Sequence, residues 1–214
     1  MKVNPPSLSD EIEDDLDAKK TLIRDEALIE ISVTQQDLSA IKVKAASVSR
    51  SKLEKVDLSE AELERFSAKD VVITGCELAG VNFADSGWRN IQINRSRCSG
   101  AQLYKSSLKD VVFDECKLDL VNFRYSKLEN VIFKDCLLDD TDFYCAKLKN
   151  VEFDNCIINN IEVSAASMKN VDFTTSELGI VKGLSGLKGA TISSLQLINL
   201  APYLAQEMEI IVKY

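Results

Sequence analysis

A five-residue period runs through this chain, without insertion, from about Leu28 to Leu178. Large apolar residues occupy one position of the period, and smaller residues occupy the position two residues earlier. An α-helix advances about 100° per residue, so residues five apart spread around it, whereas a β-strand places them on opposite faces. Neither element fits the pattern. A backbone that turns a corner every five residues does fit, because each side then points one large and one small side chain at a common axis.

Four such sides close a square coil of about 20 residues. The pattern is carried by the segments VNFRYSKLEN, VIFKDCLLDD and TDFYCAKLKN, which resemble the pentapeptide-repeat family. That family folds as a right-handed quadrilateral parallel β-helix, so the resemblance implies an all-β solenoid over residues 28–182. About 7.5 coils stacked about 4.8 Å apart would make a rod roughly 36 Å long.

Residues one coil apart are expected to form ladders along the axis of this rod. Seven phenylalanines fall at the large inward position on two opposite sides, where they would pack a thin core rather than bind a ligand. They are Phe83, Phe123 and Phe143 on one side, and Phe113, Phe133, Phe153 and Phe173 on the other.

Both ends of a rod of parallel strands need a cap, because open strand edges invite end-to-end pairing. Residues 1–27 begin with Pro5 and Pro6 and continue with an acidic stretch. They predict a flexible leader and an N-terminal cap, with a short helix from about Ser9. Residues 183–214 predict a short α-helical cap.

Within the C-terminal segment, Ser193 or Ser194 is the expected N-cap of a helix, and Pro202 is expected to kink it or begin a second one. Residues 210–212 suit a final strand. The segment has more apolar residues than one helix on a narrow rod end can bury, and it resembles the C-terminal dimerisation module of the gyrase-protecting members, the Qnr and mycobacterial fluoroquinolone-resistance types. A homodimer is therefore expected, with a capped monomer as the alternative. The expected contact residues are Leu195, Ile198, Leu200, Tyr203 and Leu204.

The chain contains no histidine, which excludes imidazole-based catalysis, histidine-ligated zinc and histidine pH switches. Four of the six cysteines, Cys76, Cys116, Cys136 and Cys156, share one inward ladder, and a straight column cannot wrap a tetrahedral metal ion. We expect no metal and no cofactor. Cys145 falls at an outward position and is the one candidate for a reactive thiol. With no cleft at the inward positions, we expect no enzyme.

Charge is distributed unevenly over the four sides, although the whole chain is acidic at −8. One side has eight basic residues against Asp70, Asp110 and Glu129, a net of +5. The opposite side, which we call the acidic side, has Arg97 and Lys117 against eight carboxylates, a net of −6. The basic residues are Arg50, Lys69, Arg89, Lys109, Lys127, Lys147, Lys149 and Lys169. The carboxylates are Asp37, Asp57, Glu60, Glu77, Asp119, Asp139, Asp140 and Glu177.

The resemblance implies a non-enzymatic rod that mimics DNA and binds a type II topoisomerase, DNA gyrase or topoisomerase IV, through the acidic side. The simpler alternative is that the charged stripe is an ordinary solvated surface. The second hypothesis is a structural scaffold, binding through an outward apolar column (Val72, Val112 and Ile132) or through Tyr104 and Tyr144, which flank Arg124. Direct nucleic-acid binding by the basic side is the minor variant.

Two further expectations concern surroundings and surface detail. With no membrane-length apolar run and no basic start, the sequence predicts a cytoplasmic protein. A polar corner ladder on the basic side runs from Asp70 through Asn90 and Asp110 to Asn170. It is interpreted as turn-forming side chains that bond to the backbone.

Overall fold

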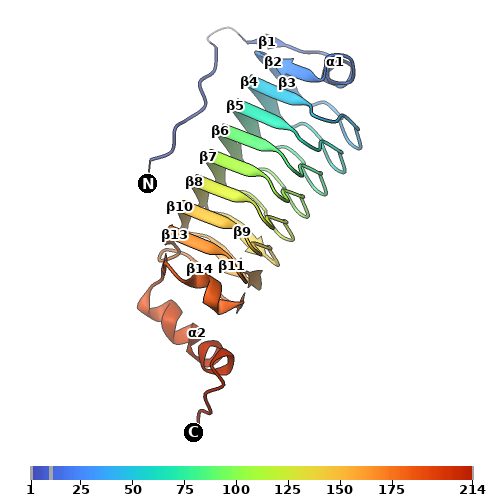
Figure 1. The fold of residues 1–214 in the computed structure, drawn as a ribbon. Coiled ribbons are helices and arrows are strands. Elements are labelled where there is room, and N and C mark those ends of the chain that lie inside the picture. The colour runs from blue at the N-terminus through green and yellow to red at the C-terminus, as the bar shows by residue number, and fades with distance from the viewer. Residues whose placement is uncertain (1, 10–11, 214) are drawn as a thin grey trace.

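The computed structural model describes residues 2–9 and 12–213 and forms a parallel β-solenoid with a helix near each end (Figure 1). Strands stack in order along the axis, from β1 at one end to β16 at the other. The nine successive pairings between β1 and β16 give a rod of roughly 43 Å at about 4.8 Å per step. The predicted four-sided β-helix with a C-terminal helical cap is confirmed.

Three parallel sheets cover the sides of the rod. The largest contains β1 (Glu13–Asp14), β2 (Ala27–Ile29), β3 (Ile31–Thr34), β4 (Ser47–Glu54), β5 (Ser67–Thr74), β6 (Gly87–Asn94), β7 (Ser107–Asp114), β8 (Lys127–Lys134), β10 (Lys147–Asp154), β13 (Ser167–Asp172) and β16 (Ala190–Thr191). The second contains β9 (Leu137–Asp139), β11 (Ile157–Asn159) and β14 (Glu177–Leu178). The third contains β12 (Ile161–Glu162) and β15 (Val181–Lys182).

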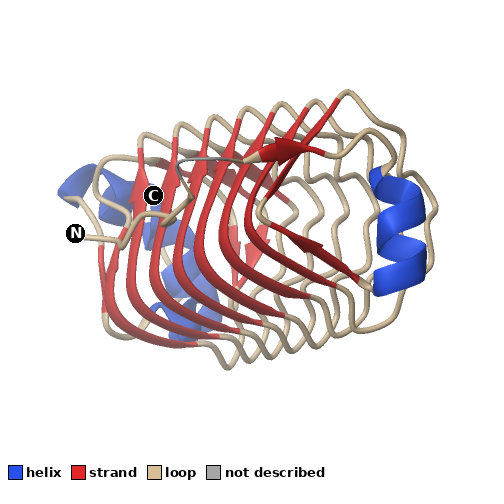
Figure 2. Cartoon of the chain, turned by 90° about the horizontal axis from the view of Figure 1, so that it is seen from above, coloured by secondary structure: helices blue, strands red, loops and turns tan. Residues whose placement is uncertain are grey.

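The register between coils matches the repeat from β2 to β13, since each paired residue there lies opposite the residue 20 positions later. The offset is 18 between β1 and β3 and 19 between β13 and β16. Phe113 pairs with Phe133, and Phe133 pairs with Phe153. Each eight-residue strand bends over two sides of the square, as Figure 2 shows for the stacked strands. Side chains of one kind are therefore placed in straight columns along the rod.

Every fifth residue from Glu30 to Asn170 forms a corner with positive φ. This is the left-handed region, which glycine, asparagine and aspartate enter most readily. Gly80 (φ 66°) is one such corner, and a Cβ there would also lie 2.2 Å from a carboxylate oxygen of Glu60. None of the corner residues is valine, isoleucine or threonine, whose branched Cβ opposes this conformation.

The core contains the seven phenylalanines assigned to it, each at most 3% exposed. Four of them, Phe113, Phe133, Phe153 and Phe173, stack with ring centroids 5.1, 4.9 and 4.5 Å apart and planes within 8° of parallel. Phe123 and Phe143 stack at 5.0 Å on the opposite side. At the N-terminal end, where Ala68 stands in a column of larger residues, an enclosed apolar void of about 20 Å³ remains.

The small inward residues have a polar role as well as a steric one. In the column that begins at Cys76, the four cysteines and Ser176 donate to a carbonyl 23 residues earlier, as Cys116 Sγ does to Ile93 O and Ser176 Oγ does to Phe153 O, whereas Ser96 Oγ donates to Asn94 O. Several also accept the amide of the residue one coil earlier, as Ser96 Oγ does from Cys76 N at 3.1 Å. These bonds serve backbone groups that the sheets leave unpaired at the corners.

Glutamine side chains close this same column at both ends. Gln36 accepts the amide of Ala18, the first residue of α1 (Ala18–Asp25), at 2.8 Å. Gln196, in α2 (Ser194–Glu207), donates to Phe173 O and Ser176 O at 2.7 Å each and is only 4% exposed. The two helices are thereby joined to the first and last coils.

Several local expectations at the ends need correction. The first helix begins at Ala18 with Asp17 as its N-cap, not near Ser9, because Asp17 accepts the Lys20 amide there; Asp10 and Glu11 lie outside the described residues. Ser193 is the N-cap of α2, in a capping box with Gln196, and the helix continues through Pro202. Residues 210–212 form no strand, and the 3-10 turn η1 (Leu184–Leu187) precedes α2.

Candidate protein-interaction surfaces

The carboxylates at the N-terminal end of the acidic side are held by the backbone. Asp37, Asp57 and Glu77 form one column, and each accepts the amide two residues later, at 2.8, 2.8 and 3.0 Å. Hydrogen bonds from Ser39 hold the pKa of the Asp37 carboxyl below its ordinary value. These side chains present negative charge from fixed positions, one coil apart.

Farther along the rod, the same column changes character. Arg97 and Lys117 follow, and Arg97 Nη1 lies 3.5 Å from Glu77 Oε2. Leu137 and Ile157 come next in register, with Ile157 half exposed, and Glu177 ends the column on β14. The acidic side is therefore interrupted by two cations and two apolar residues.

A second acidic group lies beside this interruption, in the coils that contain Lys117 and Leu137. Asp119 accepts the Ser99 hydroxyl at 2.6 Å, Asp139 accepts the Asn159 amide at 3.1 Å, and Asp140 accepts the Asn160 amide. Glu60 stands at an exposed corner of the N-terminal group. The fold thus brings the eight predicted carboxylates to one side but divides them into two groups.

The basic side is partly neutralised by its own carboxylates. Lys149 Nζ lies 2.7 Å from Glu129 Oε1, and this contact lowers the pKa of the Glu129 carboxyl. Arg50 Nε lies 2.6 Å from Glu30 Oε1.

The corner ladder differs from its interpretation as backbone-bonded turns, because its side chains hydrogen-bond to one another. Asn90 Nδ2 donates to Asp70 at 2.8 Å, Asn130 Nδ2 donates to Asp110 at 3.1 Å, and Asn150 Nδ2 donates to Asn130 at 3.0 Å. Asparagines stacked one coil apart are in position to hydrogen-bond to one another along the rod. A hydrogen bond from each side chain to the backbone of its own turn would have broken this ladder.

A tyrosine cluster lies on another side of the rod. Tyr125 sits edge-on between Tyr104 and Tyr144, with ring centroids 5.7 Å from each. The Arg124 guanidinium lies 4.6 Å from the Tyr144 ring centroid. Tyr125 was not expected in this cluster, because it is a corner residue in a different column from Tyr104 and Tyr144. Tyrosine and arginine are the residue types enriched at the energetic centres of protein interfaces.

The C-terminal helix exposes much of its apolar surface. Leu195 and Ile198 are each 67% exposed and Tyr203 is 41% exposed. Leu200, which was expected on a dimer face, instead packs at 1% exposure in the chain's own core, and Leu204 packs partly against that core. The surface left free includes Leu197, Met208 and Ile211, which the sequence-based set omitted.

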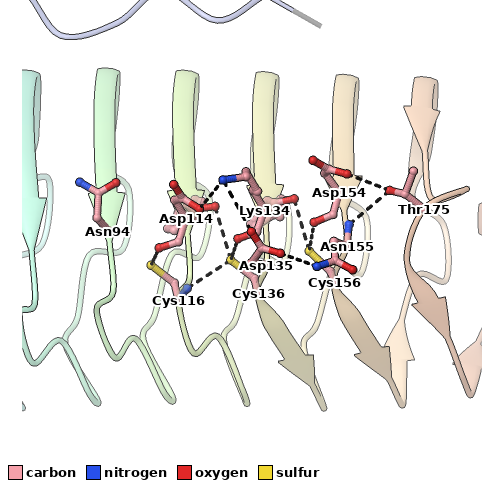
Figure 3. Close-up of polar contacts among 12 residues, drawn as sticks. Asn94, Asp114, Cys116, Lys134, Asp135, Cys136, Asp154, Asn155, Cys156 and Thr175 are labelled. Carbon is pink, nitrogen blue, oxygen red and sulfur yellow. Dashed lines mark hydrogen bonds and ion pairs between the residues drawn. The ribbon is translucent and has the colours of Figure 1, made fainter.

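The cysteine column lies beneath an outer ladder of charged residues (Figure 3). Lys134 Nζ approaches Asp114 and Asp135 at 3.2 and 3.6 Å, while Cys116, Cys136 and Cys156 point inward. Burial raises the pKa of Cys76 to about 11, and it also raises that of Cys98. Cys145 is half buried. Among the described residues, no group of three or more acidic or cysteine side chains is placed to hold a metal ion.

None of the helices in the described part of the chain is both long and apolar enough to cross a membrane.

A family model described as a pentapeptide repeat region matches residues 46–123 and 106–182. Among solved structures, the chain is similar to the pentapeptide repeat protein Rfr23 from the cyanobacterium Cyanothece 51142, at 18% identity and a TM-score of 0.44, over 57% of this chain and 88% of that one. It is also similar to full-length QnrB1, a plasmid-mediated fluoroquinolone resistance protein, at 18% identity and a TM-score of 0.37, over 84% and 100% of the two chains. No curated protein sequence matches.

Proposed function

The chain belongs to the pentapeptide repeat family, and we propose that it acts as a non-enzymatic rod that binds a protein partner through an outer side. The interior supports this proposal, because the inward columns are filled by stacked rings, aliphatic residues and small side chains bonded to the backbone. Charged and aromatic groups stand outside in straight columns with a repeat of about 4.8 Å. The free thiols suit a cytoplasmic location.

For the partner, we propose a type II topoisomerase, DNA gyrase or topoisomerase IV, that accepts the acidic side in place of DNA. The observation that carries this proposal is the fixed carboxylate column of Asp37, Asp57 and Glu77, whose oxygens are oriented by backbone amides. Charge alone gives a weak mimic. Six net charges between Asp37 and Glu177, seven coils or roughly 34 Å apart, amount to about one per 6 Å, against about one per 1.7 Å in duplex DNA. The shape of the rod must therefore supply much of the affinity.

A supercoiling assay tests the topoisomerase proposal. The purified protein is titrated into gyrase, with and without a quinolone, beside a variant carrying Asp37→Asn, Asp57→Asn and Glu77→Gln. A matched control removes three charges from the basic side with Lys127→Gln, Lys147→Gln and Lys169→Gln. We expect inhibition or drug protection by the parent and the control, and a weaker effect in the acidic-side variant. No effect of the parent at tens of micromolar would refute the proposal.

We also propose that two copies pair through α2 and the residues that follow it. Leu195, Ile198 and Tyr203 form the exposed surface that supports this pairing, and the buried stripe of the helix already faces the last coil. Light scattering after size exclusion should give twice the 23.8 kDa chain mass for the parent. Leu195→Ser with Ile198→Ser should give the monomer, whereas Leu120→Ser, an exposed leucine on the rod, should not. A monomeric parent would refute the dimer.

The tyrosine cluster supports a second candidate function, a scaffold with another protein partner. Its three rings and Arg124 offer a compact contact site on a rigid side. If supercoiling is unaffected, capture of partners by the parent but not by Tyr125→Ser would favour the scaffold. Equal capture by both would reject the cluster as the contact site.

A further inference from the structure

Residues 2–9, which we call the leader, run alongside the solenoid from the β1 end to the level of β7 (Figure 1). Three contacts join the leader to one corner column. The Ser7 amide donates to Asp70 Oδ1 at 3.1 Å. Asn4 donates to Asp110 through its backbone amide at 3.5 Å and through Nδ2 at 3.1 Å. Ser9 hydrogen-bonds to the Glu30 carboxylate, which lowers the pKa of Glu30 together with the larger effect of Arg50.

The contacted residues alternate along the column. Reading one coil at a time, the column is Glu30, Arg50, Asp70, Asn90, Asp110 and Asn130, so an acidic residue recurs on every second coil. Beyond Asp110 the column contains only asparagine, as far as Asn170. The carboxylates therefore coincide with the part of the column that the leader follows.

The spacing of the leader matches this alternation. Two coils advance about 9.5 Å along the rod. Three residues of polyproline II advance about 9.3 Å. Asn4 and Ser7 are three residues apart, and Pro5 and Pro6 between them favour that conformation. The amides at both positions thus reach successive carboxylates without strain.

Burial gives these contacts energetic weight. Asp70 and Asp110 are 6% and 2% exposed, although they stand on an outer corner. A buried carboxylate is costly unless hydrogen bonds replace the lost water. One donor comes from the asparagine of the next coil, and the leader amide supplies another. An asparagine ladder would need no such second donor from outside the rod.

We propose that this carboxylate column is a docking site for a single extended polypeptide strand with amides three residues apart, and that the chain's own leader is its resident occupant. The leader is then a segment that can be displaced, and a peptide whose amides have the same spacing competes with it for the column. This inference does not rest on the topoisomerase proposal, because the column lies at an edge of the basic side.

The first experiment removes the amide donors and leaves the rod unchanged. Asn4→Pro with Ser7→Pro deletes both backbone N–H groups and the Asn4 Nδ2 donor while favouring the same extended conformation, and Ser7→Ala keeps all three donors. The ¹⁵N order parameters of the Val3 and Leu8 amides report leader mobility in the full chain. We expect about 0.8 in the parent and below about 0.6 in the proline variant, with the Ser7→Ala single variant like the parent. A mobile parent leader, or an unchanged proline variant, would overturn the proposal.

The second experiment tests docking from outside the chain. An unlabelled peptide of residues 1–9 is titrated into the ¹⁵N-labelled proline variant. We expect chemical-shift changes at Asp70, Asn90 and Asp110. A control peptide with proline at the positions of Asn4 and Ser7 should cause none. Absent shifts, or equal shifts with both peptides, would show that the column does not recognise the amides.

Discussion

The left-handed corners predict that a β-branched residue is tolerated on the sides of the rod but not where the chain turns. Glu115 is an exposed corner residue with φ 54°, and Lys117 is an exposed strand-side residue two positions later. A left-handed backbone costs an L-residue about 1–2 kcal/mol, and branching at Cβ adds to the crowding. Glutamine has the same backbone cost, so only the added crowding at the branched Cβ separates the two variants. We therefore expect Glu115→Val to lose about 1 kcal/mol relative to Glu115→Gln, which removes the same charge without branching.

Thermal unfolding measures this difference. For a chain of this size, a loss of about 1 kcal/mol lowers the Tm by about 2–4 °C, so Glu115→Val should melt about 2–4 °C below Glu115→Gln. Glu115→Asn should melt slightly above Glu115→Gln, since asparagine tolerates the left-handed region. Lys117→Val should match Lys117→Gln. Equal losses at both positions, or no loss at Glu115, would refute the reasoning.

The remaining predictions concern the C-terminal cap, the thiols and acid stability. Gln196→Leu leaves the Ser176 carbonyl without a donor, at about 1–3 kcal/mol, and leaves the Phe173 carbonyl with only the Ser176 amide, so hydrogen exchange in the last coil should accelerate, while Gln206→Leu on the exposed part of α2 should have no such effect. Of the six thiols, only Cys145 should react with a thiol reagent in the folded protein, and all six should react in urea; early reaction at Cys116 would contradict the buried column. The lowered pKa values of Glu30, Asp37 and Glu129 add stability that is present above the ordinary carboxyl pKa near 4 and is lost as the pH falls through the folded values. With no histidine, the Tm should be flat between pH 5 and 8 and fall below about pH 4, and a step near pH 6.5 would contradict this account.

The coil, its register and its core follow from the sequence because one phase of the repeat determines which side chains point inward. The stacked phenylalanines and the buried Cys76 column are examples. The same phase shows that no corner residue is β-branched, a signal that identifies the left-handed turns without coordinates. The hydrogen-bonding role of the small column is not visible in the sequence, since it depends on which backbone groups the sheets leave unpaired.

The interaction surfaces are only partly predictable. The phase assigns each carboxylate to a side, but partners such as Arg97 beside Glu77 appear only when side chains are placed along a column. Leu200 and Leu195 look alike in sequence, yet one closes the core and the other faces outward, because the helix direction at the rod end decides between them. The path of the leader has no periodic signal of its own, so its contact with Asp70 could not be expected.

Because acidic corners recur on every second coil, the contacts between rod and leader depend on whether coils are added in even or odd numbers. Duplicating residues 87–106 would insert one coil between Asp70 and Asp110 and increase their separation by about 4.8 Å. No whole number of leader residues in polyproline II matches that increment closely, whereas two added coils match three added residues to within about 0.3 Å. The distance between the contacted carboxylates and the length of the leader can therefore change together only in steps of two coils. A chain that changed length by an odd number of coils in this region would have to release one of the two contacts.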